Sequence, residues 1–228
     1  MTTSRPTRDT AKNRTPRPAV RTTGLTKRYG EVPALAPLDI EVPAREHVAI
    51  VGHNGSGKST LLAMLAGSLD PSGGSASIFG SEPGSIDARR AVSYLPDSPV
   101  LYDDLSVREH LQYVSRLHGT DDGDDRADEL IERLGLTKRA DDLPSQFSRG
   151  LRQKTAIAVG LCRPFRLLLV DEPFVGLDDD GRHCFVTLLA EARDRGATTI
   201  VATHDPGELG TIDRRLVLRD GELIEDSR

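Results

Sequence analysis

Apolar residues occur along the chain in two patterns that predict different elements. The segments HVAIV (47–51), RLLLV (166–170) and TTIVAT (198–203) are largely continuous apolar runs. Such runs are typical of parallel strands that are covered on both faces. STLLAMLAGSL (59–69) instead has apolar residues at helical spacing. Strands of this kind joined to amphipathic helices predict an α/β fold.

Residues from about 104 to 160 show helical spacing and no good strand pattern. SVREHLQYVSRLHG (106–119) and RADELIERLGL (126–136) repeat apolar residues every three or four positions. The acidic run DDGDD (121–125) lies between them and does not fit a calcium-binding loop, so we interpret it as a solvated linker. The pattern predicts an α-helical subdomain, about 98–160, inserted into the α/β domain.

The remaining segments predict short strands and set the domain limits. SASIFG (75–80) and AVSYLP (91–96) are strand candidates, and 35–42 alternates apolar and polar residues. RRLVLRDGELIED (214–226) predicts a hairpin that turns at Asp220-Gly221. Residues 1–19 are rich in Thr, Arg and Pro and predict a disordered basic tail before one domain, 20–228. The tail is either simply solvated or in contact with anionic lipid headgroups.

Composition narrows the class of protein. The 228 residues carry a net charge of −5, which gives no support for binding nucleic acid. No apolar run approaches the ~20 residues that cross a bilayer, and the N-terminus lacks the apolar region of a secretion signal. Cys162 and Cys184 fit no metal or redox motif, so we expect two buried free thiols in a reducing cytoplasm.

The segment GHNGSGKST (52–60) matches the pattern G-x-x-x-x-G-K-[ST] between a predicted strand and a predicted helix. In this motif the backbone N–H groups and the helix N-terminus surround phosphates. We expect Lys58 to reach the β- and γ-phosphates and Ser59 to bind Mg²⁺. The predicted nucleotide contacts of the loop are Gly52, Asn54, Gly55, Ser56, Gly57, Lys58, Ser59 and Thr60.

RLLLVDEP (166–173) supplies carboxylates at the end of a predicted buried strand. Asp171 is positioned to hold Mg²⁺ or its water shell. Glu172 is the candidate general base that polarises the attacking water. Together with the phosphate loop, these residues predict a nucleoside triphosphatase.

The segment FSRGLRQK (147–154) indicates which kind of triphosphatase this is. Phe147, Ser148, Gly150 and Gln153 lie where the ABC transporter signature has Leu, Ser, Gly and Gln. From about Thr22 onward the chain resembles the nucleotide-binding subunit of an ABC transporter. The resemblance implies a P-loop NTPase with a RecA-like core, an N-terminal antiparallel β subdomain and an inserted α-helical subdomain. It also implies that Ser148 and Gly150 cap the γ-phosphate of ATP bound to a second subunit.

Three more residues match family positions. Tyr29 in KRYG lies where an aromatic ring stacks on adenine; an ordinary core tyrosine is the alternative. Asp178 in VGLDDD matches an aspartate that contacts the opposite subunit. His204 in VATHD matches the histidine that binds the γ-phosphate, with a structural histidine as the alternative. The resemblance thus implies Lys58, Glu172 and His204 as the catalytic set.

Two positions depart from the family pattern. Arg149 replaces the commonest glycine of the signature, a change found in export-type members. Asp97 in YLPDSP replaces a glutamine that links Mg²⁺ and the attacking water to the membrane subunits. An ionised Asp cannot donate a hydrogen bond, but its carboxylate can still lie on the metal side. We therefore expect Ser59, Asp97 and Asp171 on the Mg²⁺ side of the site.

The resemblance implies an ATP- and Mg²⁺-dependent ATPase subunit that powers export through a separate membrane-spanning subunit. It would pair with a second, identical or related ATPase subunit on the cytoplasmic face of the membrane. We further expect the loop 97–102 to dock onto the membrane subunit, unless Val100 and Leu101 fold back into the helical core. The alternatives are a soluble ABC ATPase, such as one serving iron–sulfur assembly, and a regulatory module that rarely hydrolyses ATP.

Overall fold

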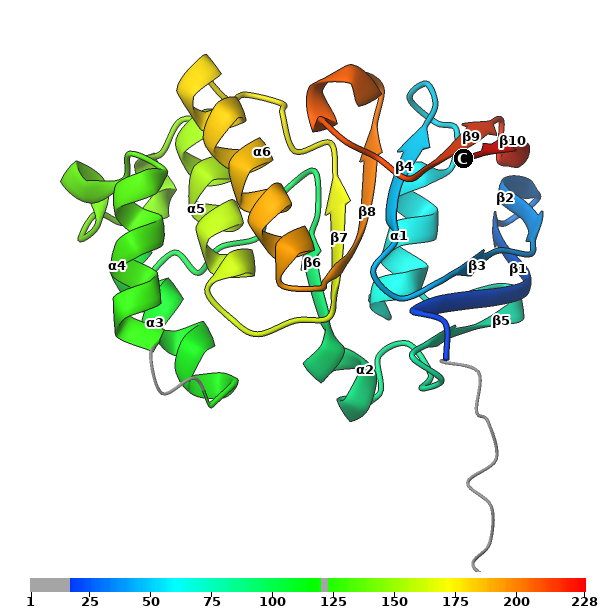
Figure 1. The fold of residues 1–228 in the computed structure, drawn as a ribbon, viewed down its shortest axis with the longest axis horizontal. Helices are drawn as coiled ribbons and strands as arrows, with labels where there is room; N and C mark the ends of the chain where they lie inside the picture. Colours follow the sequence, from blue (N-terminus) through cyan, green and yellow to red (C-terminus); the bar gives the residue numbers. More distant parts are fainter. Residues whose placement is uncertain (1–16, 120–122) are drawn as a thin grey trace, which may run out of the picture.

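The computed structural model describes residues 17–119 and 123–228, which form two sheets and a group of helices (Figure 1). Residues 1–16 of the predicted tail and 120–122 of the predicted linker lie outside the described residues. Ala19, which we assigned to the tail, is fully buried, and its carbonyl oxygen accepts a hydrogen bond of 2.9 Å from the Phe79 N–H.

The larger sheet has the strand order β10-β9-β4-β8-β7-β6. Neighbouring strands from β9 to β6 are parallel, and β10 joins the edge antiparallel to β9. The continuous apolar runs form its centre, as predicted. The strands are β4 (His47–Val51), β6 (Val92–Leu95), β7 (Leu167–Asp171), β8 (Thr198–Thr203), β9 (Arg214–Arg219) and β10 (Glu222–Ser227).

The smaller sheet is antiparallel and is organised around one long strand, β1, that pairs with the other three. The Thr22 hydroxyl donates to the Leu38 carbonyl (2.8 Å) and accepts from the Ile40 N–H (2.9 Å), which ties β1 to the β2–β3 connection. This sheet is the predicted N-terminal β subdomain. Its strands are β1 (Val20–Tyr29), β2 (Val32–Leu38), β3 (Glu41–Val42) and β5 (Gly73–Ile78).

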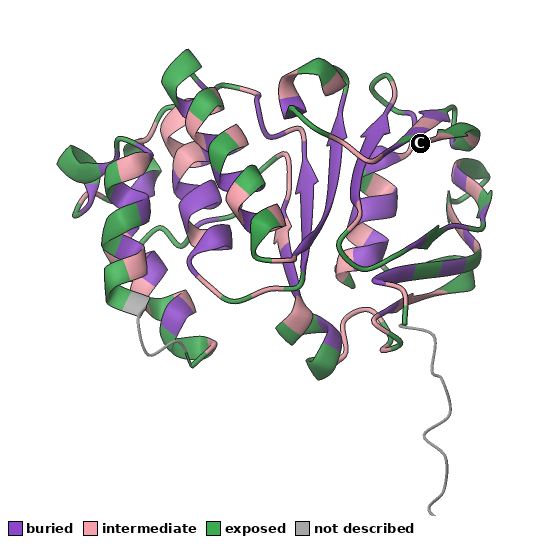
Figure 2. Ribbon diagram, in the orientation of Figure 1, coloured by how far each residue is buried: buried purple, intermediate pink, exposed green. Residues whose placement is uncertain are grey.

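Two helices cover opposite faces of the larger sheet. Helix α1 (Lys58–Ala66) packs in a core shared by both sheets, whose buried residues include Leu62, Ile50 and Leu169. Helix α6 (Asp179–Asp194) covers the other face through a second core that contains Phe185. Figure 2 shows the central strands almost wholly buried between these layers. The predicted coverage on both faces is therefore confirmed.

The predicted helical insert consists of helices and short turns beside the sheet. Its elements are α3 (Val107–Leu117), α4 (Gly123–Arg133), 3₁₀ turns at Thr137–Arg139 and Pro144–Gln146, and α5 (Arg149–Leu161). Helix α3 begins with a capping box between Ser106 and Glu109, which satisfies backbone donors of its first turn. Leu111 and Ile157 are fully buried in the core that the insert shares with α6. A short helix, α2 (Ile86–Ala91), precedes β6, and a 3₁₀ turn, Pro206–Leu209, follows β8.

The terminal hairpin turns where the sequence predicts it. Asp220 and Gly221 both have positive φ, 49° and 83°, as a two-residue turn between twisted strands requires. The two cysteines are free, but only Cys162 is buried. Cys184 is half-buried on α6, so the prediction of two buried thiols is wrong for that residue.

Candidate functional site

The segment 52–57 forms a tight loop between β4 and α1. Gly57 has a φ of 101°, and a side chain there would meet the Ala34 carbonyl oxygen at 2.8 Å. A side chain on Gly52 would lie 2.4 Å from the Leu218 carbonyl oxygen. The Gly221 N–H donates to the Ser56 carbonyl oxygen (3.1 Å), so the hairpin turn supports the loop. The backbone is therefore held close around a space next to the N-terminus of α1, which favours anions.

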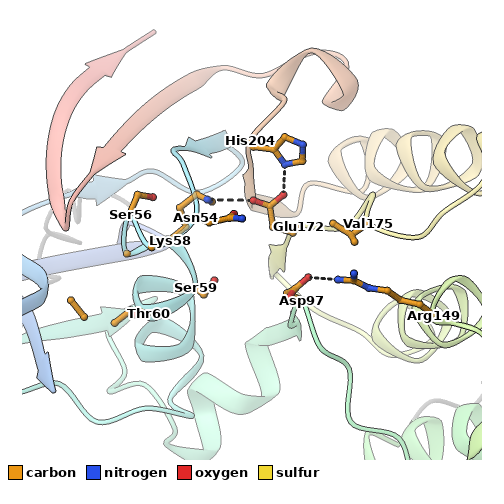
Figure 3. Close-up of a pocket in the computed structure, with 13 residues that line it drawn as sticks. Asn54, Ser56, Lys58, Ser59, Thr60, Asp97, Arg149, Glu172, Val175 and His204 are labelled. Carbon is orange, nitrogen blue, oxygen red and sulfur yellow. Dashed lines mark hydrogen bonds and ion pairs between the residues drawn. The ribbon is translucent and has the colours of Figure 1, made fainter.

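This space is a pocket of about 790 Å³. Figure 3 shows its side chains arriving from the loop, from the ends of β6, β7 and β8, and from the start of α5. It brings together most residues that the sequence assigns to the site. The lining residues are Ala34, Asn54, Gly55, Ser56, Gly57, Lys58, Ser59, Thr60, Asp97, Arg149, Glu172, Val175 and His204.

Lys58 points back over the loop. Its ammonium group donates hydrogen bonds to the carbonyl oxygens of Gly52 (2.7 Å) and His53 (3.3 Å). It also forms an ion pair of 3.3 Å with Glu172, and its side chain is only 5% exposed. These contacts place a buried positive charge in the concave face of the loop, where phosphates would lie.

Asp171 lies beneath the pocket at the end of β7. The Ser59 hydroxyl bonds to its carboxylate, but burial outweighs this contact and raises the pKa of Asp171. Its buried oxygen Oδ1 has no hydrogen-bond partner within the described part of the chain. An unpaired carboxylate oxygen beside a serine hydroxyl fits the hard oxygen ligands that Mg²⁺ prefers.

No group of three or more His, Cys, Asp or Glu residues within 17–119 and 123–228 could hold a metal ion by itself. This agrees with magnesium sites in which one or two carboxylates act together with phosphates of the nucleotide.

Glu172 has an unusual backbone conformation. Its φ is 45°, which costs energy in a non-glycine residue, and its N–H donates to the Ala202 carbonyl oxygen (2.9 Å). This conformation aims its carboxylate between Lys58 and the His204 ring, whose Nδ1 lies 3.0 Å from Oε2 (Figure 3). The side chain is only 13% exposed. A carboxylate held in this way can accept a proton from a water in the pocket.

Asp97 and Arg149 both line the pocket and contact each other. Arg149 Nη2 lies 3.4 Å from Asp97 Oδ1 (Figure 3). The Asp97 charge contributes to the raised pKa of Asp171. Burial, with Asp171 and Asp97 as further causes, raises the pKa of Tyr94 to about 12. The Asp97 carboxylate therefore acts electrostatically on the same side of the site as Asp171.

Ser148, Gly150 and Asp178 line a different pocket, of about 370 Å³. Ser148 caps α5 by accepting a hydrogen bond of 3.3 Å from the Leu151 N–H. Asp178 caps α6 and pairs with Lys154 at 2.8 Å, and the Lys154 hydrogen bond lowers the pKa of Asp178. Ser148 and Gly150 do not line the larger pocket, whereas Arg149 between them lines both pockets, and the capping of a γ-phosphate on a second subunit stays a prediction.

Tyr29 lies at the end of β1 and lines neither pocket. Its side chain is 55% exposed, with Lys27 Nζ 5.4 Å from the ring centroid. The alternative of an ordinary core tyrosine is therefore wrong, and the contact with adenine stays a prediction.

Three neighbouring residues of the predicted docking loop, 100–102, differ in their exposure to solvent. Val100 is 94% exposed and Tyr102 is 57% exposed, whereas Leu101 is only 9% exposed. Leu101 folds inward, so a docking surface cannot include its side chain. Val100 and Tyr102 remain available to a partner.

His110, which the sequence analysis did not assign, holds this loop. It is 3% exposed, and its Nε2 accepts a hydrogen bond from the Tyr102 N–H (2.8 Å). Because the amide donates, Nε2 carries the lone pair and Nδ1 carries the proton, which it donates to the Ser106 carbonyl oxygen (2.8 Å). A neutral imidazole thus joins the loop to the first turn of α3.

Comparison with known proteins identifies the family. A family model described as "ABC transporter" matches residues 35–175. The SkfA peptide export ATP-binding protein SkfE of Bacillus subtilis (strain 168) is 33% identical over 205 residues, which cover 89% of this chain and 86% of SkfE. The chain belongs to the ABC transporter family. It is an ATP-binding, ATP-hydrolysing subunit, as the phosphate loop and signature predict.

Other relatives extend the comparison. The macrolide export ATP-binding/permease protein MacB of Nitrosomonas europaea is 35% identical over 225 residues; they cover 92% of this chain but only 34% of MacB. A structure of an ATP-binding subunit of an ABC transporter superimposes with a TM-score of 0.85 at 29% identity, covering 92% of this chain and 89% of that chain.

A dimeric, post-hydrolysis state of an ATP-binding cassette bound to ADP and Pi superimposes with a TM-score of 0.83. It is 26% identical and covers 92% of this chain and 98% of that chain. The predicted ABC ATPase fold, with its antiparallel β subdomain, is confirmed.

Proposed function

We propose that the ABC ATPase binds Mg²⁺-ATP in the 790 Å³ pocket, with the phosphates in the loop around Lys58. The unpartnered Oδ1 of Asp171 beside the Ser59 hydroxyl carries the magnesium assignment. When bound, Mg²⁺ neutralises charge that develops on the β- and γ-phosphates. On binding, Lys58 exchanges its ion pair with Glu172 for phosphate oxygens. Tyr29, at the end of β1, supplies the ring that stacks on adenine.

Glu172 acts as the general base. Its carboxylate is nearly buried, and the Lys58 ammonium lies 3.3 Å away until phosphate takes that cation. His204, at 3.0 Å, then holds one carboxylate oxygen in place while the other faces the attacking water. A second donation, from Nε2 to the γ-phosphate, requires the protonated ring, in which both nitrogens are donors. These roles rest on the convergence of Lys58, Glu172 and His204 in one pocket.

Catalysis takes place between two ATPase subunits arranged head to tail. In this arrangement Ser148 and Gly150 of one subunit cap the γ-phosphate held by the loop of the other. A backbone N–H, a small hydroxyl and the start of α5 suit an anion. Asp178, in the same pocket, contacts the opposite subunit. Support comes from the separation of this pocket from the phosphate loop in one chain and from the dimeric cassette relative.

The cycle drives export through a separate membrane subunit, with the ATPase on the cytoplasmic face. The names of SkfE and MacB, which both refer to export, support this direction. Among the described residues, no helix is long and apolar enough to cross a membrane. The soluble assembly ATPase and the regulatory module are weaker alternatives, because the names of SkfE and MacB refer to export and because Glu172 lies where a general base is needed.

The exposed residues Val100 and Tyr102, together with Tyr113 of α3, form the surface that docks onto the membrane subunit. The rings of Tyr102 and Tyr113 meet edge to face at a centroid distance of 5.8 Å, and Tyr113 is 43% exposed. A half-exposed aromatic pair beside an exposed valine suits an amphipathic helix of a partner. His110 holds the loop in this position.

The function is tested with Glu172→Gln. The amide keeps the shape of the side chain but cannot accept a proton, so ATP hydrolysis should fall by about 10²–10⁴-fold while ATP binding remains. The variant should elute as a dimer in size-exclusion chromatography with ATP and Mg²⁺, and as a monomer with EDTA. Hydrolysis at the wild-type rate would refute the general base. An ATP-bound variant that stays monomeric would refute the homodimer.

A further inference from the structure

We propose that Asp97 and Arg149 form a latch that Mg²⁺ opens: in the nucleotide-free subunit Arg149 holds the Asp97 carboxylate, and binding of Mg²⁺-ATP draws that carboxylate away. The inference rests on the proposed metal side of the site. It concerns two of the positions at which this chain departs from the family pattern, where a carboxylate replaces an amide and a guanidinium replaces glycine.

The pair joins two parts of the fold. Asp97 follows β6, in the loop that leads to the helical insert, and Arg149 is the first residue of α5. Their side chains lie 3.4 Å apart and both line the pocket of the phosphate loop. The latch therefore fixes the start of α5, next to the signature residue Ser148, relative to the nucleotide-binding core.

The Asp97 carboxylate has two competing cationic partners. Arg149 is the partner that Asp97 contacts in this structure, at 3.4 Å, and a metal ion beside Asp171 is the other. Asp97 lines the same pocket as Ser59, whose hydroxyl is proposed to bind Mg²⁺, so a cation held there also attracts the Asp97 carboxylate. A divalent cation attracts a carboxylate more strongly than a guanidinium at equal distance.

The solvent exposure of its two side chains limits the strength of the latch. The Asp97 side chain is 42% exposed and that of Arg149 is 65% exposed. Exposed pairs of this kind are weak and are screened by salt, so the latch should change Mg²⁺ coupling by about two- to five-fold. A weak latch suits a switch, because ligand binding can open it without a large loss of affinity.

The test measures by how much Mg²⁺ raises the affinity of the subunit for nucleotide, under conditions in which no nucleotide is hydrolysed. A fluorescent, non-hydrolysable ATP analogue is titrated with excess Mg²⁺ and with EDTA, and the ratio of the two affinities is the coupling factor. Arg149→Gln should raise this factor about two- to five-fold, and Arg149→Lys should stay near wild type. The matched control is Arg152→Gln, which removes a cation of α5 that contacts the Pro144 carbonyl oxygen and should leave the factor unchanged.

Asp97→Asn separates the latch from simple repulsion between Arg149 and the metal. If the latch exists, Arg149→Gln raises the factor in the wild-type background but not in Asp97→Asn, and 0.5 M KCl reduces the difference. An equal rise in both backgrounds, or no rise in either, overturns the latch.

If Asp97→Asn alone leaves the coupling unchanged, Asp97 does not face the metal, which overturns both the latch and that assignment. If wild type shows no coupling at all, the Mg²⁺ part of the proposed function also fails.

Discussion

Aspartate substitutions at Val100 and Leu101 should have very different effects on the stability of the subunit, although the two residues are neighbours in the chain. Val100 is 94% exposed, so Val100→Asp should change the free energy of unfolding by less than about 0.5 kcal/mol. Leu101 is 9% exposed, and Leu101→Asp loses about 1.5–3 kcal/mol of apolar burial. Burying an unpaired polar group adds about 1–3 kcal/mol, which gives a total of about 2.5–6 kcal/mol.

These energies translate into distinct melting temperatures. In a domain of this size 1 kcal/mol shifts Tm by about 2–4 °C, so Leu101→Asp should lower Tm by about 5–24 °C and Val100→Asp by no more than about 2 °C. Differential scanning calorimetry of the isolated subunit measures both. Leu101→Met, which keeps the volume, is the control and should remain within about 1.5 kcal/mol of wild type.

The same variants test docking. Val100→Asp should keep basal ATP hydrolysis and lose the stimulation that the membrane subunit provides in proteoliposomes. If Val100→Asp destabilises the subunit as much as Leu101→Asp, the burial on which this reasoning depends is wrong. Normal stimulation of a stable Val100→Asp would refute the docking surface.

The remaining predictions concern the composite site. Lys58→Ala should abolish ATP hydrolysis, because it removes the cation that faces the β- and γ-phosphates; undiminished turnover by a pure preparation would refute the phosphate loop. Ser148→Arg should leave nucleotide binding to its own loop intact and block dimerisation. Mixing Ser148→Arg with Lys58→Ala places both lesions in one composite site and leaves the other unaltered, so mixing should recover activity if one site can turn over alone. No recovery, when single-site turnover is shown independently, would exclude capping between subunits.

Local patterns predicted the core of this fold well. The apolar runs of β4, β7 and β8 admit few other interpretations, because a strand buried on both faces has no polar side to display. The phosphate loop is equally local, since its glycines, Lys58 and Ser59 are contiguous in the sequence. The hairpin at Asp220-Gly221 follows from a turn that needs two positive φ angles.

Contacts between distant segments could not be predicted in this way. The sequence does not show that Leu101 turns inward while Val100 turns outward, because both are apolar and lie outside any periodic element. Nor does it show that His110 holds the Tyr102 amide, or that Arg149 reaches Asp97 across 52 residues. Such contacts depend on how the helical insert packs against the sheet, which the spacing of residues within one element does not specify.

Arg214 illustrates a long-range contact with a measurable effect on stability. Its side chain is 7% exposed and donates two hydrogen bonds of 2.6 Å to Asp226 and one of 2.6 Å to the Glu41 carbonyl oxygen, so it connects the two sheets. The Asp226 side chain is 40% exposed, so Arg214→Met should cost about 1.5–3 kcal/mol, as for hydrogen bonds to charged groups, and Arg214→Lys should cost less because it keeps the charge. The Arg214 hydrogen bonds lower the pKa of Asp226. The contribution of the pair is therefore complete above the ordinary pKa of an aspartate, about 3.9, and is lost as the pH falls through the lowered value.

Urea unfolding should show a constant difference in the free energy of unfolding between wild type and Arg214→Met from pH 8 to 5, and a shrinking difference below about pH 4. A difference that instead grows towards acid pH would show that Asp226 is not the partner that makes Arg214 stabilising.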